Sequence, residues 1–319
     1  MTIATITLGA FWGNLAGLAA LLCIGLVIAL LATSALITRR LTRPPRRTYA
    51  SAVARGLPGD PRELDRPLEF ETWALRSGSH ALPAWTIRGE NPGGPTLIFA
   101  HGWGDSRVGA LARVPHVARL CAQMIALDLP GQGDAAGLCA LGTREHAHLR
   151  AAMRAVEPGR GVILFGWSLG AGACLRLAGE LGEQPDAELP RLLGVIAEAP
   201  YRVPTTPARN VLELSGLPHR VPLPIAFAAL NLCSRGELSR ARFDRVLWAS
   251  RARVPVLVLH GRLDEICPLA DGEAIAAAAP RGRVAVIDEG HHNDLWTEPA
   301  LCAQAASATG GFVREIAGA

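Results

Sequence analysis

The first 38 residues of the chain contain no charged side chain, which limits what the N-terminal segment can form. Leu15 to Ile37 is almost entirely Leu, Ala, Ile, Val and Gly. A helix rises about 1.5 Å per residue, so about 20 apolar residues cross a bilayer, where backbone hydrogen bonds must be satisfied internally. We therefore predict one transmembrane helix, an anchor comprising residues 1–38.

A cleaved signal peptide is the alternative interpretation of this run. Signal peptides begin with basic residues, carry an apolar core of about 7–15 residues and end at a small-residue cleavage site. No Lys or Arg precedes the run here, and the run is much longer than such a core. The sequence therefore favours an anchor over a cleaved signal.

Basic residues follow the apolar run directly: Arg39, Arg40, Arg43, Arg46 and Arg47. By the positive-inside rule, the end of a membrane helix that carries such residues stays in the cytoplasm. We therefore expect a single-pass protein whose N-terminus faces outwards and whose remaining residues face the cytoplasm. The seven cysteines are scattered, with no C-x-x-C spacing, which agrees with free thiols in a reducing compartment.

The rest of the chain divides into a linker and one folded domain. Residues 39–67 are rich in Arg, Pro and Gly and lack hydrophobic periodicity, so we predict a linker there. In residues 68–319, runs of strand length that are apolar on both faces alternate with segments of helix length, as a parallel sheet covered by helices requires. The runs are Thr96–Ala100, Gln123–Leu127, Val162–Phe165, Leu193–Ala197, Val254–Leu259 and Val284–Ile287. An antiparallel pair is expected before them, at Leu68–Arg76 and Ala84–Gly89.

The predicted helices are Arg107–Leu120, Thr143–Val156, Leu169–Leu181, Asp271–Ala279 and one after Glu298. The fold class is therefore α/β, a mainly parallel sheet with helices on both faces. About fifty residues separate two of the strands, several times a usual connection. Prolines punctuate this interval, and its segment Leu223 to Leu232 is strongly apolar. We predict a small helical lid at about 201–252, with Phe227 and Leu230 as candidates for contacting substrate.

Gly166-Trp167-Ser168-Leu169-Gly170 forms a G-x-S-x-G pattern. It follows a predicted strand and opens a predicted helix, so Ser168 would lie on the sharp strand-to-helix turn called a nucleophile elbow. The glycines suit such a turn because it leaves no room for a Cβ atom on either side. The pattern alone is weak, and its position between a strand and a helix is what strengthens it.

A serine hydroxyl becomes a good nucleophile only when a histidine, oriented by a carboxylate, takes its proton. Asp264 stands just past the strand Val254–Leu259, and His292 stands just past Val284–Ile287. All three residues would thus lie at the carboxyl ends of parallel strands, the edge where open α/β sheets build their sites. Asp244 and Asp294 remain alternatives to Asp264, and His291 remains an alternative to His292.

Acyl transfer also needs an oxyanion hole. His101-Gly102-Trp103-Gly104 follows the strand Thr96–Ala100. The backbone N–H of Trp103 could therefore bind a developing oxyanion together with that of Leu169, which lies at the positive end of its helix. His101 and His260 are expected to bond to backbone groups near the site rather than to act as bases.

These motifs resemble those of the α/β-hydrolase superfamily, from about Leu68 to the C-terminus. The strings FGWSLG and EGHHNDLW are similar to a membrane-tethered branch of α/β-hydrolase-domain proteins, whose last motif reads E-G-x-H-N-D. That register selects His292 as the base and makes His291 its variable neighbour. Asp128-Leu129-Pro130-Gly131-Gln132-Gly133 resembles the family's D-x-P-G-x-G turn, but Ala135 stands where a serine is common.

The resemblance implies a serine hydrolase that cleaves an ester or thioester through an acyl-enzyme on Ser168. Some relatives in that broad group remove fatty acyl chains from proteins or lipids, so the expected substrate is a small-molecule or lipid-borne acyl ester. An acyltransferase that uses an acceptor other than water, and a hydrolase-shaped scaffold without turnover, are the alternatives. The intact set of nucleophile, base and acid argues against the scaffold.

Other chemistry has little support in the sequence. The chain contains no lysine, which excludes Schiff-base and P-loop enzymes that depend on one. His146 and His148 stand two apart on a predicted helix and cannot share a face, and no H-E-x-x-H occurs, so we expect no metal site. We also expect no cofactor. The basic run is short and has no aromatic-rich basic face beside it, so no nucleic-acid partner is expected.

Overall fold

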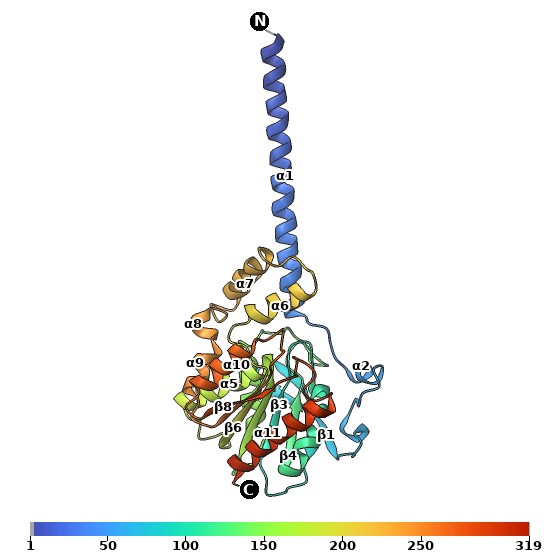
Figure 1. Cartoon of the computed structure of the whole chain (residues 1–319), viewed down its shortest axis with the longest axis vertical. Helices are drawn as coiled ribbons and strands as arrows, with labels where there is room; N and C mark the ends of the chain where they lie inside the picture. The colour runs from blue at the N-terminus through green and yellow to red at the C-terminus, as the bar shows by residue number, and fades with distance from the viewer. Residues whose placement is uncertain (1–2, 319) are drawn as a thin grey trace.

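One eight-stranded sheet lies at the centre of the structure, a computed structural model that describes residues 3–318 (Figure 1). The remaining residues, 1, 2 and 319, belong to the predicted anchor and the predicted domain and lie outside the described residues. The strand order is β1-β2-β4-β3-β5-β6-β7-β8. β1 (Phe70–Ser77) and β2 (His80–Arg88) pair antiparallel, and β2 also pairs antiparallel with β4.

All other neighbouring strands are parallel, which confirms the mainly parallel sheet with an antiparallel opening pair. They are β3 (Thr96–Ala100), β4 (Gln123–Leu127), β5 (Val162–Trp167), β6 (Leu192–Glu198), β7 (Val256–Gly261) and β8 (Gly282–Ile287). The residues of β3, β5 and β7 are buried throughout, and since successive side chains point to opposite sides of the sheet, these strands are buried on both faces, whereas the edge strand β8 is partly exposed. Ile98 thus packs into one core and its neighbour Phe99 into the other.

Helices cover both faces of the sheet. On one face α4 (Glu145–Arg154), α5 (Leu169–Glu183) and α10 (Leu269–Ala278) contact the strands, and α9 (Arg245–Arg251) packs against α5. α11 (Pro299–Ala317) and α3 (Val114–Val117) pack together over the other core. The predicted helices at α4, α5, α10 and α11 are confirmed.

The helix predicted at Arg107–Leu120 is wrong as a single element. The structure divides it into η2 (Arg107–Ala112), α3 and η3 (Ala118–Leu120). Pro115 explains the division, because it has no N–H to donate and its ring clashes with the preceding turn of a continuous helix. Proline is tolerated only in the first turn, which is its position in α3.

The interval after β6 is helical, as the lid prediction requires. It contains α6 (Thr205–Leu214), α7 (Pro222–Cys233) and α8 (Arg240–Phe243), and it ends with α9. Figure 1 shows α6 and α7 above the sheet, next to the lower end of the long N-terminal helix, against which α7 packs. They share a small core with that helix, in which Leu212, Leu223 and Phe227 pack with Ile37.

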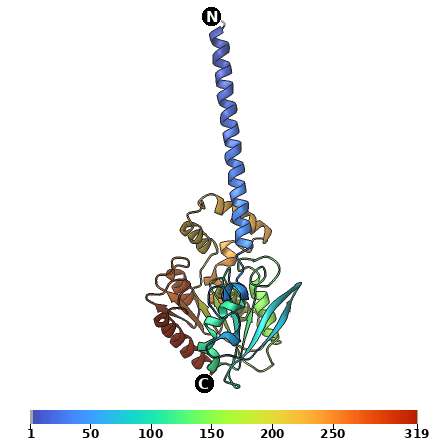
Figure 2. The same cartoon turned by 90° about the vertical axis from the view of Figure 1, so that its right-hand side faces the viewer.

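α1 (Ile3–Thr42) is a single helix of 40 residues that projects from the folded domain (Figures 1 and 2). Its segment Trp12–Thr42 is long and apolar enough to cross a membrane. α1 continues into the segment predicted as a linker, which also contains α2 (Tyr49–Val53) and η1 (Pro61–Glu63). α1 therefore reaches the domain as one continuous helix.

Candidate active site

Ser168 lies on a tight turn between β5 and α5, with φ 52° and ψ −113°. Residues with a side chain rarely adopt such angles, and the strain marks sites where geometry serves a function. A Cβ atom at Gly166 would lie 2.3 Å from the backbone of Gly170, and one at Gly170 would lie 1.9 Å from the carbonyl oxygen of Ala100. Both flanking positions therefore require glycine.

Asp264 and His292 come together from the ends of β7 and β8. Nδ1 of His292 lies 2.7 Å from Oδ2 of Asp264. The other oxygen, Oδ1, accepts the backbone N–H groups of Ile266 at 2.9 Å and Cys267 at 2.7 Å. The turn after β7 thus fixes the carboxylate, which in turn orients the imidazole.

The alternative acids and base have other partners. Asp244 pairs with Arg202 and caps α9, and Asp294 accepts the backbone N–H of His291. The His291 side chain is exposed and lies 3.0 Å from a carboxylate oxygen of Glu265. None of these three residues lines the cavity that contains Ser168, whereas His292 does.

The two neighbouring histidines contact backbone groups, as predicted. Nε2 of His101 accepts the N–H of Leu129 at 2.9 Å, and its Nδ1 lies 2.8 Å from the carbonyl oxygen of Gly102. Nε2 of His260 lies 2.8 Å from the carbonyl oxygen of Cys267 and 3.4 Å from Oδ2 of Asp264. Through these contacts the two histidines hold the loops that contain Leu129 and Cys267 next to the site.

The charges of the pair stabilise each other. Burial alone would raise the pKa of Asp264, but hydrogen bonds from His260 and His292 hold it well below its ordinary value. Burial would likewise lower the pKa of His292, but the adjacent Cys267 and the Asp264 carboxylate raise it well above the ordinary histidine value. Asp264 is therefore ionised at neutral pH and favours a protonated His292.

Cys267 is a neighbour of the site that the sequence did not suggest. Its buried sulfur lies within 4.8 Å of ligand atoms of Asp264 and His292, a set that could hold a metal ion. Two of these three groups already bond to each other, and burial raises the pKa of the Cys267 thiol, which opposes the thiolate that a metal needs. The structure thus places a hydrogen-bonded carboxylate–imidazole pair at this position.

Two backbone N–H groups close to Ser168 have no hydrogen-bond partner among residues 3–318. Trp103 follows β3 and Leu169 opens α5, and neither N–H donates to another residue in the described part of the chain. Both residues line the cavity beside Ser168. They are placed to donate to an oxygen that develops negative charge there.

Sequence reasoning missed a buried network beneath the elbow. Glu198, at the end of β6, accepts the Ser168 N–H on its carbonyl oxygen at 2.8 Å. Its carboxylate accepts Nε of Arg113 at 2.9 Å and Nε1 of Trp296 at 2.8 Å. The Arg113 guanidinium stacks 4.0 Å from the centre of the Trp167 ring. The only sequence signal was an acidic residue directly after the apolar run Leu193–Ala197.

A cavity of about 750 Å³ opens over Ser168, and we call it the Ser168 cavity. Its walls come from the strand ends, from α6 and α7, and from the end of α1. Phe227, one of the two lid candidates, lines it, whereas Leu230 packs against the core of the domain. This volume lies in the range of small-molecule sites, about 300–1,000 Å³.

Neither a protein-family model nor a curated protein sequence matches the chain. The esterase Pf2001 from Pyrococcus furiosus is similar in structure, with a TM-score of 0.63 and 18% identity over 87% of this chain and 98% of that one. A membrane phospholipase A described as a bacterial virulence factor has a TM-score of 0.56 and 18% sequence identity, and the match covers 94% of this chain and 98% of that one. An esterase from Exiguobacterium antarcticum has a TM-score of 0.54 and 16% sequence identity, and the match covers 76% of this chain and 100% of that one. These similarities show a shared fold.

Proposed function

We propose that this chain, which has the α/β-hydrolase fold, is a membrane-anchored serine hydrolase that cleaves a carboxylic ester or thioester. One observation carries the proposal. His292 bonds to Asp264 at 2.7 Å and lines the same cavity as Ser168, which is held on a strained turn between two obligatory glycines. A nucleophile, a base and an orienting acid are the parts that acyl transfer requires.

In the proposed mechanism, Oγ of Ser168 attacks the acyl carbonyl carbon while His292 takes the hydroxyl proton. Asp264 holds the imidazole in the required tautomer and stabilises its positive charge. The N–H groups of Trp103 and Leu169 bind the oxyanion. The imidazolium then protonates the leaving group, and an acyl-enzyme remains. Water, deprotonated by His292, attacks the acyl carbonyl and releases the acid and Ser168.

A lipid-borne substrate is the second part of the proposal. α1 can cross a bilayer and its last residues line the Ser168 cavity, so the site would lie next to the membrane surface. Similarity to a membrane phospholipase A over 94% of this chain supports this choice. A tethered enzyme meets lipid substrates at high effective concentration.

Fluorophosphonate labelling tests the nucleophile. We expect the probe to label the wild-type protein in membranes and the Ser168→Ala variant not at all, because the probe reacts with an activated serine hydroxyl. Ser215, which also lines the cavity but lies in the lid, offers a matched control, and Ser215→Ala should still be labelled. Labelling of Ser168→Ala would refute the assignment.

Activity should rise with pH. The base acts only as neutral imidazole, and the pKa of His292 is raised above its ordinary value by Cys267 and the Asp264 carboxylate, so the active fraction should grow as the pH rises through that pKa. We expect kcat/KM for a non-ionising ester to increase through a midpoint above about 6.5, the ordinary histidine pKa. His291→Gln should leave that midpoint unchanged. A midpoint below the ordinary value would contradict the proposed pairing.

We further propose that the hydrolase domain faces the cytoplasm, because the arginines lie at the domain end of α1. A reporter fused after Ala319 that fluoresces only in the cytoplasm should be active. A second reporter that is active only outside the cytoplasm should be silent at the same position. The reverse result would place the domain on the opposite side of the membrane.

A further inference from the structure

The end of α1 forms one wall of the Ser168 cavity, where Ile37 and Leu41 contribute apolar surface. Two hydrogen bonds fix this wall to the domain. Nε1 of Trp103 donates to the carbonyl oxygen of Leu41 at 2.8 Å, and the N–H of Cys139 donates to that of Thr42 at 3.0 Å. Trp103 also carries one of the proposed oxyanion donors, so α1 contacts the proposed catalytic machinery directly.

The same wall carries positive charge. Arg40, Arg43 and Arg47 line the cavity, and Asp105 is the only carboxylate in its described lining. Arg47 lies 3.4 Å from Asp105, which compensates that charge. Among residues 3–318, no carboxylate pairs with Arg40 or Arg43. The apolar cavity is therefore bordered by two uncompensated guanidinium groups.

We propose that Arg40 and Arg43 bind the phosphate of the substrate head group, so that the preferred substrate is an anionic acyl ester phospholipid. The inference rests on the proposed hydrolase function. A guanidinium group matches phosphate oxygens with two parallel hydrogen bonds, and a partly apolar surrounding strengthens the attraction. The acyl chain would lie against Leu41, Leu212 and Phe227, while its ester carbonyl reaches Ser168.

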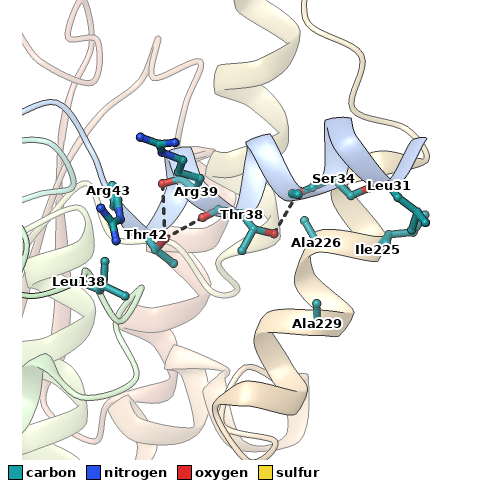
Figure 3. A pocket seen from close by; sticks show the side chains of 11 residues that line it. Leu31, Ser34, Thr38, Arg39, Thr42, Arg43, Leu138, Ile225, Ala226 and Ala229 are labelled. Carbon is teal, nitrogen blue, oxygen red and sulfur yellow. Dashed lines mark hydrogen bonds between the residues drawn. The ribbon is translucent and has the colours of Figure 1, made fainter. Parts of the chain in front are cut away.

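The arginines have another task, since basic residues at a helix end also set topology and attract anionic lipids. Arg39 separates the two roles. It belongs to the same basic run but lines only a different hollow, a groove of about 670 Å³ between α1 and α7, whereas Arg43 lines both this groove and the Ser168 cavity. Figure 3 shows Arg39 in the groove together with Ile225, Ala226 and Ala229 of α7. Arg39→Gln removes one positive charge from the same run without changing the lining of the Ser168 cavity, so its matched partner is Arg40→Gln, which also removes one charge.

The test compares two lipids with the same oleoyl chain, 1-oleoylglycerol 3-phosphate and neutral 1-oleoylglycerol, in mixed micelles. Wild-type protein should show a kcat/KM at least about tenfold higher for the phosphate lipid, as expected for hydrogen bonds to a charged group. The Arg40→Gln/Arg43→Gln variant should bring the ratio of the two values close to one. Of the two single variants, each of which removes one charge, Arg40→Gln should lower the ratio several-fold and Arg39→Gln should keep it. Since the ratio is taken within each variant, it does not depend on the amount of active enzyme.

Three results would overturn the proposal. The ratio could survive in the double variant, or it could fall equally in Arg39→Gln and Arg40→Gln, which would assign the preference to the general surface charge. The third result concerns inhibition of neutral-lipid hydrolysis by two compounds, inorganic phosphate and a non-hydrolysable ether analogue of the phosphate lipid. Equal inhibition by both would indicate a site for free phosphate. Fluorophosphonate labelling of Ser168 in each sample separates these results from failure of the hydrolase function itself.

Discussion

Replacement of His292 by alanine is expected to lower kcat by a factor of roughly 10⁴–10⁶, nearly as much as loss of Ser168. The members of a triad act as a unit, because Ser168 without its base is an ordinary alcohol. The residual rate would come from substrate binding and from the N–H donors of Trp103 and Leu169. Hydrolysis of an oleoyl ester by purified variants in detergent micelles measures the effect.

His291→Ala is the matched control for this experiment. The two histidines are adjacent, but the His291 side chain is exposed and bonds to Glu265 at the surface. We expect the control to change kcat by no more than a few-fold. If His291→Ala caused the larger loss, the assignment of the base to His292 would be wrong.

Gly170→Ala should be the most damaging single substitution for the fold near the site. The added Cβ would lie 1.9 Å from the Ala100 carbonyl oxygen, so α5 and β3 would have to move apart. Overpacking typically costs about 1–3 kcal/mol of unfolding free energy, and a contact with rigid backbone places this variant at the upper end of that range. The shift would also displace Ser168, so fluorophosphonate labelling should be lost. Thermal unfolding in detergent and labelling of the same sample measure both effects.

Gly311→Ala provides the control for helix propensity. Gly311 lies in α11 with no atom within 4 Å of the added Cβ. Alanine there should raise the unfolding free energy by about 0.5–1 kcal/mol, since it restricts the unfolded chain and favours the helix. Similar melting temperatures for the two variants would show that the contact between α5 and β3 can relax.

The sequence predicted those parts of the fold whose determinants are local. Strands such as Thr96–Ala100 were recognisable because a buried parallel strand must be apolar on both faces. The position of Ser168 followed from a glycine-flanked turn between a strand and a helix. The break at Pro115 could have been read from the proline itself, but the apolar residues around it favoured a continuous helix.

The parts that could not be predicted depend on contacts between distant segments. Arg113 and Glu198 are 85 residues apart, and neither position has a local pattern that indicates a buried pair. Cys267 reaches the site only because the turn after β7 folds back to cap Asp264. The position of α1 against Trp103 depends on the rotation of the helix about its axis, which composition does not determine.

The contact between α1 and Trp103 divides α1 into two parts whose sequences should be conserved to different degrees. Up to about Leu31 the described side chains face outwards, and their identities can drift among apolar residues. From Ser34 onwards α1 is also part of the domain, with Ser34 and Ile37 buried, and an inserted residue would rotate the following positions by about 100°. Homologous sequences should therefore vary freely in the first part and keep both length and residue type in the second. An apolar helix taken from a different protein could therefore replace the first part alone.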